Sequence, residues 1–229
     1  MVQIEFEGKT VSGLKRLPEQ GFSNENHIFD LESKTYLFRK FKLADRDRKL
    51  EFDIQTLAYR KKLAAKPYAL DLSEGYMICE FIEGEHREKL EREDILLVAQ
   101  VLKKLHALKI EQPPLDLKSQ FSILNKTVEN AFKIIESTPA ETVLCHNDLN
   151  PRNCLFSDKG LKLIDWEFSA MNDRYFDLAA VCIEFDLSQS DTDMFLNTYF
   201  EEEKWHQEKL DAYKTVYSEL CKQWFKENT

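Results

Sequence analysis

A short segment between residues 144 and 169 constrains the fold of this chain most strongly. Its sequence, LCHNDLNPRNCLFSDKGLKLIDWEFS, places the apolar runs CLF and LKLI on either side of the turn-forming residues SDKG. Such a pattern predicts two short strands that are joined by a hairpin. Amphipathic helical patterns come before and after this segment, notably REDILLVAQVLKKLHAL and KSQFSILNKTVENAFKIIES. The segment therefore interrupts a mainly helical part of the chain.

The chain before residue 83 has a different character. VQIEF and TYLFRKF alternate apolar and polar residues, the turn-rich QGFSNEN lies between them, and GYMICEFIEG predicts a further strand. One helix is expected in ADRDRKLEFDIQTLAYRKKLAA, with Leu50 and Ile54 on one face and Asp45 as its N-cap. We therefore predict an α+β fold in two lobes: a small β-rich lobe over 1–82 and a larger, mainly helical lobe over 83–229.

Composition and charge exclude several classes of partner. The 229 residues include 32 basic and 41 acidic side chains, a net charge of -9, whereas nucleic-acid binding needs a basic face. The N-terminus shows no signal peptide and no apolar run approaches the length of a membrane span, so we expect a cytoplasmic protein without membrane insertion. The five cysteines are scattered without a CxxC pair. They are typical of core residues in a reducing compartment and match no zinc pattern.

The loop HNDLNPRN carries the clearest chemical signal. Its His-x-Asp-Leu-x-x-x-Asn spacing equals that of a kinase catalytic loop. In phosphoryl transfer a carboxylate orients the acceptor hydroxyl and accepts its proton, and an amide oxygen five residues later helps to hold Mg²⁺. Asp148 and Asn153 fit these two roles, and His146 is expected to be structural. Any one of these residues alone would more often stabilise a turn.

Asp165 supplies a second metal ligand at the end of the LKLI run. Mg²⁺ prefers hard oxygen ligands and usually takes one or two carboxylates from a protein. Glu167 stands where protein kinases have the glycine of the DFG signature, and too little chain follows for an activation loop. We therefore predict that the acceptor is a small molecule and not a protein.

The motifs CHNDLNPRNCL, LIDWEFSAMNDRYFDLA and VCIEF together resemble the choline/ethanolamine kinase family. This family is a branch of the group that includes the aminoglycoside phosphotransferases, and it has a protein-kinase-like fold. The resemblance covers about residues 20 to 185. It implies an enzyme that uses ATP and Mg²⁺, with catalytic roles for Asp148, Asn153 and Asp165, the last two as metal ligands. It also implies that Asp177 braces the catalytic loop through backbone hydrogen bonds.

The resemblance implies nucleotide-binding residues in the first lobe as well. GFSNEN is similar to the turn that covers the phosphates, and YLFRKF to the strand whose basic residue reaches them. That residue is Arg39, with Lys40 as the alternative, and Glu51 in the following helix is its partner. CEFIEG is similar to the segment whose backbone meets adenine. The residues implied in this way are Ser23, Asn24, Arg39, Glu51, Glu80 and Ile82.

Acidic and aromatic side chains indicate a cationic acceptor. In an extended chain Glu167 would point to the same face as Asp165, and a carboxylate left free of the metal there is costly unless it meets a cation. The resemblance adds Glu184 as a second acid and Trp224 as part of an aromatic cage for a quaternary ammonium group. The substrate-binding residues implied are Asp148, Glu167, Glu184 and Trp224.

We therefore predict an ATP-dependent kinase that phosphorylates the hydroxyl of choline to give phosphocholine. The cage is thin unless Trp205, Tyr213 or Tyr217 adds to it, which leaves ethanolamine or another amino alcohol as an alternative. An aminoglycoside-type phosphotransferase is a second alternative, and a catalytically silent nucleotide- or choline-binding module is a third. The C-terminal region is short for the family, so a second chain could complete the pocket in a homodimer.

Overall fold

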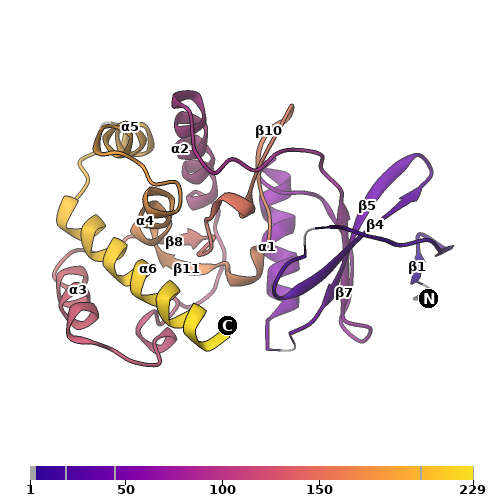
Figure 1. Ribbon diagram of the computed structural model, residues 1–229, viewed down its shortest axis with the longest axis horizontal. Helices are drawn as coiled ribbons and strands as arrows, with labels where there is room; N and C mark the ends of the chain where they lie inside the picture. Colours follow the sequence, from indigo (N-terminus) through magenta and orange to yellow (C-terminus); the bar gives the residue numbers. More distant parts are fainter. Residues whose placement is uncertain (1–3, 19, 44, 202, 229) are drawn as a thin grey trace. The chain divides into compact units, whose positions relative to one another are not determined.

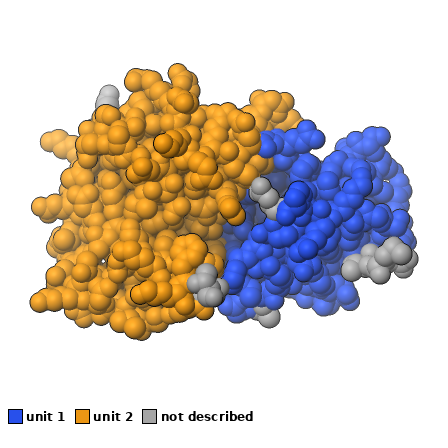
Figure 2. Space-filling model, in the orientation of Figure 1, with its two compact units in different colours: residues 1–84, 162–167 blue, residues 85–161, 168–229 orange. Residues whose placement is uncertain are grey.

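The computed structural model describes residues 4–18, 20–43, 45–201 and 203–228. Within them the chain forms two compact units, which Figure 2 colours separately. The first unit contains residues 1–84 and 162–167, and the second contains residues 85–161 and 168–229. The first unit thus ends at Gly84 instead of residue 82. It also includes 162–167, which the sequence analysis assigned to the second lobe.

A five-stranded antiparallel sheet forms the first unit (Figure 1). Its strand order is β3-β4-β5-β7-β6, and a small hairpin of β1 and β2 precedes it. The strands are β1 (Ile4–Phe6), β2 (Lys9–Val11), β3 (Lys15–Arg16), β4 (Asn24–Leu31), β5 (Lys34–Phe41), β6 (Pro67–Asp71) and β7 (Tyr76–Glu80). They confirm the strands expected in TYLFRKF and GYMICEFIEG. Residues 2 and 3 of the expected VQIEF strand lie outside the described residues.

Aromatic packing forms the core of this sheet. Phe6 contacts both Phe29 and Tyr36, with ring centroids 6.0 and 5.1 Å apart. The tight turn between β4 and β5 has Glu32 and Ser33 at positive φ, the geometry that matches the twist of a two-residue hairpin. Phe6, Phe29 and Tyr36 thus belong to one hydrophobic core.

Helix α1 (Arg48–Arg60) buries charged residues along with apolar ones. Its N-cap is Asp47 and not Asp45, because the helix begins later than expected and the Asp47 carboxylate accepts from the N–H of Leu50 at 2.9 Å. Its buried stripe combines Ile54 with Arg48 and Glu51, which are 5% and 2% exposed. A buried charge must be paired, so this helix face contributes to a charged site.

Helices dominate the second unit. They are α2 (Arg92–His106), α3 (Lys126–Glu136), α4 (Arg174–Glu184), α5 (Gln189–Phe200) and α6 (Gln207–Asn228), with short 3-10 turns at Lys118–Gln120 and Pro151–Asn153. Helix α6 packs against α3 and α4, and α2 packs against α5. Helix α3 begins only at Lys126, since Asn125 caps it by accepting from two backbone N–H groups at 3.0 Å. In the described part of the chain, every helix is too short or too polar to span a membrane.

Short strands frame the polar loop. Strands β8 (Thr142–Cys145) and β11 (Ala170–Asp173) pair antiparallel, with Ala170 opposite Cys145. Strand β9 (Cys154–Ser157) leads into a turn in which the Ser157 hydroxyl donates to the carbonyl of Gly160 at 2.9 Å. Strand β10 (Gly160–Leu163) then carries the chain from the second unit into the first. The two strands predicted on either side of SDKG are confirmed.

The segment 162–167 is tied firmly to the first unit. The N–H of Leu163 donates to the carbonyl of Leu63 at 2.8 Å, and the amine of Lys162 bonds the carbonyl of Lys62. Trp166 is 1% exposed, and its indole N–H donates to the carbonyl of Leu163 at 3.1 Å. These contacts hold the end of β10 beside the sheet and helix of the first unit.

Candidate active site

A cluster of buried charges lies in the first unit, where β5, α1 and the segment after β10 meet. Arg39 donates from Nη1 to Glu51 Oε1 at 2.9 Å and from Nη2 to Asp165 Oδ1. Burial disfavours the charged guanidinium, but the carboxylates of Asp165 and Glu51 outweigh it and raise the pKa of Arg39. Arg39 is therefore a fixed positive charge, and it has the carboxylate partner that the sequence suggested.

Lys40, the alternative to Arg39, lies on the other face of β5. Its amine bonds the carbonyl of Glu74 in an exposed position. Successive side chains of a strand point to opposite faces, so only Arg39 reaches the charged cluster.

The two residues expected to cover phosphates are buried against this cluster. Asn24, in the side-chain orientation that satisfies both of its polar atoms, accepts from Arg39 Nη2 at 2.8 Å and donates to the carbonyl of Ser23 at 3.1 Å. The Ser23 hydroxyl bonds the carboxylate of Glu167. Phe22 beside them is exposed. The turn thus supports the cluster from one side, and its role toward phosphate stays a prediction.

Glu167 is not the unpaired carboxylate that the sequence suggested. Arg48 Nη1 donates to Glu167 Oε2 at 2.9 Å, and the Glu167 side chain is only 4% exposed. The expectation assumed an extended chain, whereas Trp166–Phe168 is a 3-10 turn and Asp165 has a φ of 63°. Residues two apart therefore do not share a face here. Burial and then the charge of Asp165 raise the pKa of Glu167, while Ser23 and Arg48 lower it.

Asp165 itself occupies an uncommon backbone conformation. A non-glycine residue with positive φ costs about 1–3 kcal/mol, and such residues cluster at functional sites. Its side chain is 27% exposed, which makes it the most accessible carboxylate of the cluster. Asp165 thus combines a strained position with a carboxylate that a ligand can reach.

The expected adenine-binding segment lies at the end of β7. The N–H of Glu80 donates to the carbonyl of Lys66 at 2.8 Å, so the sheet already uses this donor. Ile82 lies beyond the end of the strand, where the chain has left the sheet. Of the two residues, Ile82 is the better placed to offer its backbone N–H.

In the second unit, Asp177 braces the loop that contains Asp148. Its carboxylate, fully buried, accepts from the N–H of His146 at 2.8 Å and of Asn147 at 2.9 Å. His106 Nε2 lies 3.1 Å from the same carboxylate. These are the backbone contacts that the family resemblance implied for Asp177, and they fix the two residues that precede Asp148.

His106, Cys145 and Asp177 bring three potential metal ligands within 4.8 Å of one another. Each already has a protein partner: Tyr199 lies 2.6 Å from His106 Nδ1, and the Cys145 thiol contacts the carbonyl of Asn172 at 3.6 Å. Burial raises the pKa of the Cys145 thiol well above its usual value, which disfavours the thiolate that a metal needs. We therefore assign this group a structural role.

Two amides orient the Asp148 carboxylate. Asn153 Nδ2 donates to Asp148 Oδ2 at 2.7 Å and to the Asp148 carbonyl at 2.8 Å, and Asn150 Nδ2 donates to Asp148 Oδ1 at 3.0 Å. Both bonds of Asn153 use its nitrogen, so its oxygen is the atom that it can offer to a cation. Asp148 and Asn153, predicted to act together, are therefore in direct contact.

A second acid of this unit lies on α4. Tyr217 on α6 donates from its hydroxyl to Glu184 Oε1 at 2.9 Å. Burial raises the pKa of Glu184, the Tyr217 bond lowers it, and the charge of Asp148 raises it again. The charge of Asp148 thus acts on Glu184, and the role of Glu184 toward an acceptor stays a prediction.

The aromatic residue beside Glu184 is Tyr217, one of three alternatives from the sequence. Its ring meets Phe176 edge-on at 5.5 Å. Trp224 lies about two turns further along α6, and its ring packs against Phe225 at 5.2 Å. Residues seven apart share a helix face. The seven-residue spacing between Tyr217 and Trp224 is therefore the sequence signal that could have favoured Tyr217 over Trp205 and Tyr213.

Comparisons with known proteins agree with these motifs. The family model described as choline/ethanolamine kinase matches residues 113–223. Protein LicA of Haemophilus influenzae is 26% identical over 205 residues, which are 78% of this chain and 60% of that protein. The chain thus spans less than two thirds of the length of this relative.

Solved structures show the same likeness. The choline kinase LicA from Streptococcus pneumoniae superimposes with a TM-score of 0.76 at 23% identity, covering 95% of this chain and 86% of that one. A structure of LicA in complex with AMP has a TM-score of 0.74 at 23% identity, with 95% and 83% covered. Macrolide and aminoglycoside phosphotransferases are also similar in structure. The resemblance to the choline/ethanolamine kinase family and the kinase-like α+β fold class are confirmed.

Proposed function

We propose that this chain, with its similarity to choline/ethanolamine kinases over residues 113–223, transfers the γ-phosphoryl group of ATP to the hydroxyl of choline. The observation that carries the proposal is the environment of Asp148. Two amides orient its carboxylate at 2.7 and 3.0 Å, and Asp177 fixes the backbone just before it. A carboxylate held in this way is suited to orient a hydroxyl and accept its proton.

The metal and nucleotide would be held by hard oxygens and by one guanidinium. The Asn153 amide oxygen and the Asp165 carboxylate fit the ligand preference of Mg²⁺. Bound Mg²⁺ would neutralise the charge that develops on the phosphate oxygens. Arg39, charged and held by Glu51, is the residue to contact the phosphates, because a guanidinium can donate to two oxygens at once.

The cationic end of the acceptor would meet Glu184 and Tyr217. An aromatic face attracts a quaternary ammonium group, which favours choline. The carboxylate and hydroxyl pair, at 2.9 Å, also offers hydrogen-bond acceptors that suit a primary ammonium. This contact keeps ethanolamine as the second candidate. Glu167 is not proposed to contact the acceptor, since Arg48 and Ser23 already bind it.

The test is an assay of the purified chain with ATP and Mg²⁺ against choline, ethanolamine and an aminoglycoside. ADP formation gives the rate, and ³¹P NMR identifies the phosphorylated product. Phosphocholine with the highest kcat/KM supports the proposal. A higher kcat/KM for ethanolamine or for the aminoglycoside would show that this compound, and not choline, is the preferred acceptor. ATP binding without turnover of any acceptor would instead indicate a silent binding module.

A further inference from the structure

Arg48, at the start of α1, has no role assigned so far, yet it connects two parts of the charged cluster. Its Nη1 donates to Glu51 Oε2 at 2.7 Å and to Glu167 Oε2 at 2.9 Å. Glu51 is also the partner of Arg39, and Glu167 lies two residues after Asp165. A single nitrogen thus joins α1 to the segment that carries Asp165.

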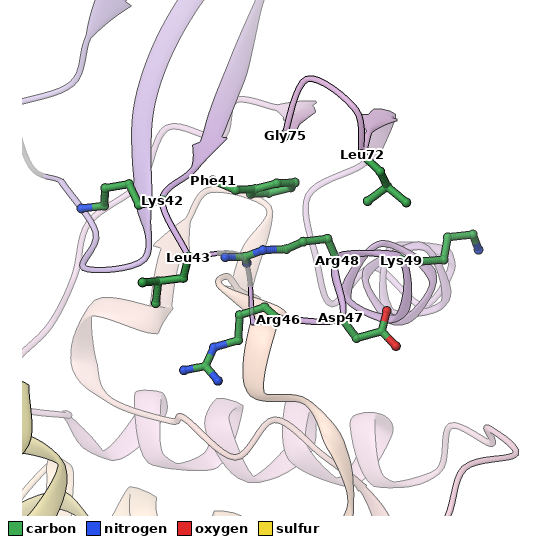
Figure 3. Close-up of a pocket in the computed structure, with 9 residues that line it drawn as sticks. All are labelled: Phe41, Lys42, Leu43, Arg46, Asp47, Arg48, Lys49, Leu72 and Gly75. Carbon is green, nitrogen blue, oxygen red and sulfur yellow. The ribbon is translucent and has the colours of Figure 1, made fainter.

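The environment of Arg48 shows that this position is maintained at a cost. The side chain is 5% exposed, and its Nε and Nη2 have no hydrogen-bond partner among the described residues. Its guanidinium lies 4.3 Å from the centre of the Phe41 ring, beneath that ring in Figure 3, at the wall of a pocket of ≈ 390 Å³. The attraction of the Phe41 ring compensates only in part for two N–H donors of Arg48 without a hydrogen-bond partner. Replacing a whole set of buried charges by apolar side chains is often neutral or stabilising, so the burial of these ion pairs is weak evidence for a purely stabilising role.

The two carboxylates explain it better. The Glu167 side chain is 4% exposed, and Arg48 Nη1 donates to its Oε2 at 2.9 Å, while the same nitrogen holds Glu51 at 2.7 Å. Without Arg48, this buried carboxylate would lose its arginine partner, and Glu167 would tend to turn away from the cluster. The loss of Arg48 would thereby disturb the short turn that follows Asp165, and it would leave Glu51 with Arg39 as its single arginine partner in the cluster.

We infer that Arg48 is a positioning residue, which fixes Asp165 and the Arg39–Glu51 pair in the geometry needed for ATP and its metal by bridging Glu51 and Glu167. The inference rests on the proposed phosphoryl transfer. It assigns Arg48 to the nucleotide side of the reaction, so removing Arg48 should affect ATP and Mg²⁺ but not the affinity for the acceptor.

The test replaces Arg48 by Met, which is of similar length and has no charge. We expect kcat/KM for ATP to fall by about 10²-fold, the size of effect that small misplacements cause. The Mg²⁺ concentration for half-maximal rate should rise, and the KM for the acceptor should stay unchanged. Lys49→Met is the matched control, because Lys49 is the next residue of the helix and its exposed side chain pairs with Asp53, on the solvent side of α1. It should behave as the wild type.

Two further variants separate positioning from folding. Arg48→Lys should recover most of the loss, because one nitrogen already makes both bonds and an ammonium has three donors. Glu167→Gln should raise the KM for ATP in the same direction as Arg48→Met. Added to Arg48→Met, it should cause little further loss, because the two residues act as one unit. If Arg48→Met does not fold, Arg48→Lys and Glu167→Gln still test the inference.

Titration calorimetry with ATP and Mg²⁺ provides a readout that does not depend on turnover. Weaker ATP binding by Arg48→Met, with normal binding by Lys49→Met, supports the inference even if the wild type phosphorylates no acceptor. In that case the proposed function fails and the positioning role stands. Unchanged ATP affinity and Mg²⁺ dependence in Arg48→Met, or equal losses toward ATP and acceptor, would overturn the inference.

Discussion

The Tyr217 hydroxyl donates a hydrogen bond to Glu184 Oε1 at 2.9 Å, and its helix, α6, begins 23 residues after Glu184, the last residue of α4 (184 to 207). The bond stabilises the ionised carboxylate against burial, which raises the pKa of Glu184. A carboxylate must be ionised to attract a cation. The ionisation of Glu184 should therefore depend on Tyr217, and under the proposed function so should the affinity for the cationic acceptor.

Tyr217→Phe should move the acidic limb of the profile of kcat/KM against pH to higher pH. Removing the hydroxyl takes away a hydrogen bond to the charged form of Glu184, which should raise the pKa of Glu184 further. The profile of kcat/KM for the acceptor against pH measures this shift. Glu184→Gln should abolish the limb. Coincident limbs in the wild type and Tyr217→Phe would show that Glu184 does not control acceptor binding.

Glu184→Gln should also stabilise the fold at neutral pH. Because the pKa of Glu184 is raised in the folded chain, the folded state binds the proton more tightly than the unfolded state. The stability that this gives is complete below the ordinary glutamate pKa of about 4.3 and is lost as the pH rises through the folded value. Thermal unfolding at pH 7 should show a higher Tm for Glu184→Gln, and the difference should vanish near pH 4. A lower Tm at pH 7 would contradict this account.

Asp148→Ala should abolish turnover and spare the affinity for ATP. A general base contributes about 10²–10⁴-fold to a rate, and Asp148 is the carboxylate that Asn150 and Asn153 orient. Steady-state kinetics and calorimetry with ATP measure the two effects separately. Asp158→Ala, an exposed aspartate of the turn after β9, is the control. Activity surviving in Asp148→Ala would place the base elsewhere.

Asp177→Asn should destabilise the protein. The buried carboxylate accepts hydrogen bonds from two backbone N–H groups, one at each oxygen. In asparagine an NH₂ group replaces one oxygen, so it would face a backbone N–H and could not accept its hydrogen bond. Disrupting buried charged interactions of this kind costs about 2–5 kcal/mol. Urea titration followed by circular dichroism measures the loss. Asp211→Asn, on the exposed face of α6, should leave stability unchanged.

Arg39→Lys should weaken the use of ATP although the charge is kept. An ammonium cannot reproduce the forked contacts that Nη1 and Nη2 make to Glu51 and Asp165. Losing one charge-assisted hydrogen bond costs about 1.5–3 kcal/mol, or about 10- to 100-fold in kcat/KM for ATP. Lys40→Arg is the control on the opposite face of β5. An Arg39→Lys variant with normal kinetics toward ATP would exclude this role for Arg39.

Local sequence patterns predicted much of the fold. The alternation of TYLFRKF and the apolar runs around SDKG correspond to β5, β9 and β10. Strands β8 and β11 were missed, because they pair with each other across a separation of more than twenty residues. Such pairing depends on tertiary contacts and leaves little trace in a local pattern.

Motif spacing singled out Asp148 and Asn153, and the family resemblance paired Arg39 with Glu51; both pairs are in contact, and their functions remain predictions. Motif spacing could not predict Arg48, because a charged residue in the first turn of a helix normally lies on the surface. Its burial depends on Glu167, which is 119 residues away along the chain. The free carboxylate expected at Glu167 was wrong for a related reason: the backbone after Asp165 forms a turn that the neighbouring sequence does not reveal.

The first unit is discontinuous in sequence, and this has a consequence for its synthesis. Arg39 and Arg48 leave the ribosome well before Asp165 and Glu167, which are two of their three carboxylate partners. Until then the nascent sheet would hold two arginines with incomplete neutralisation, and burying them would be unfavourable. We expect the N-terminal segment to mature only after residue 167 has emerged. A truncated chain that ends at residue 84 should accordingly be far more sensitive to proteolysis than the same residues in the whole chain.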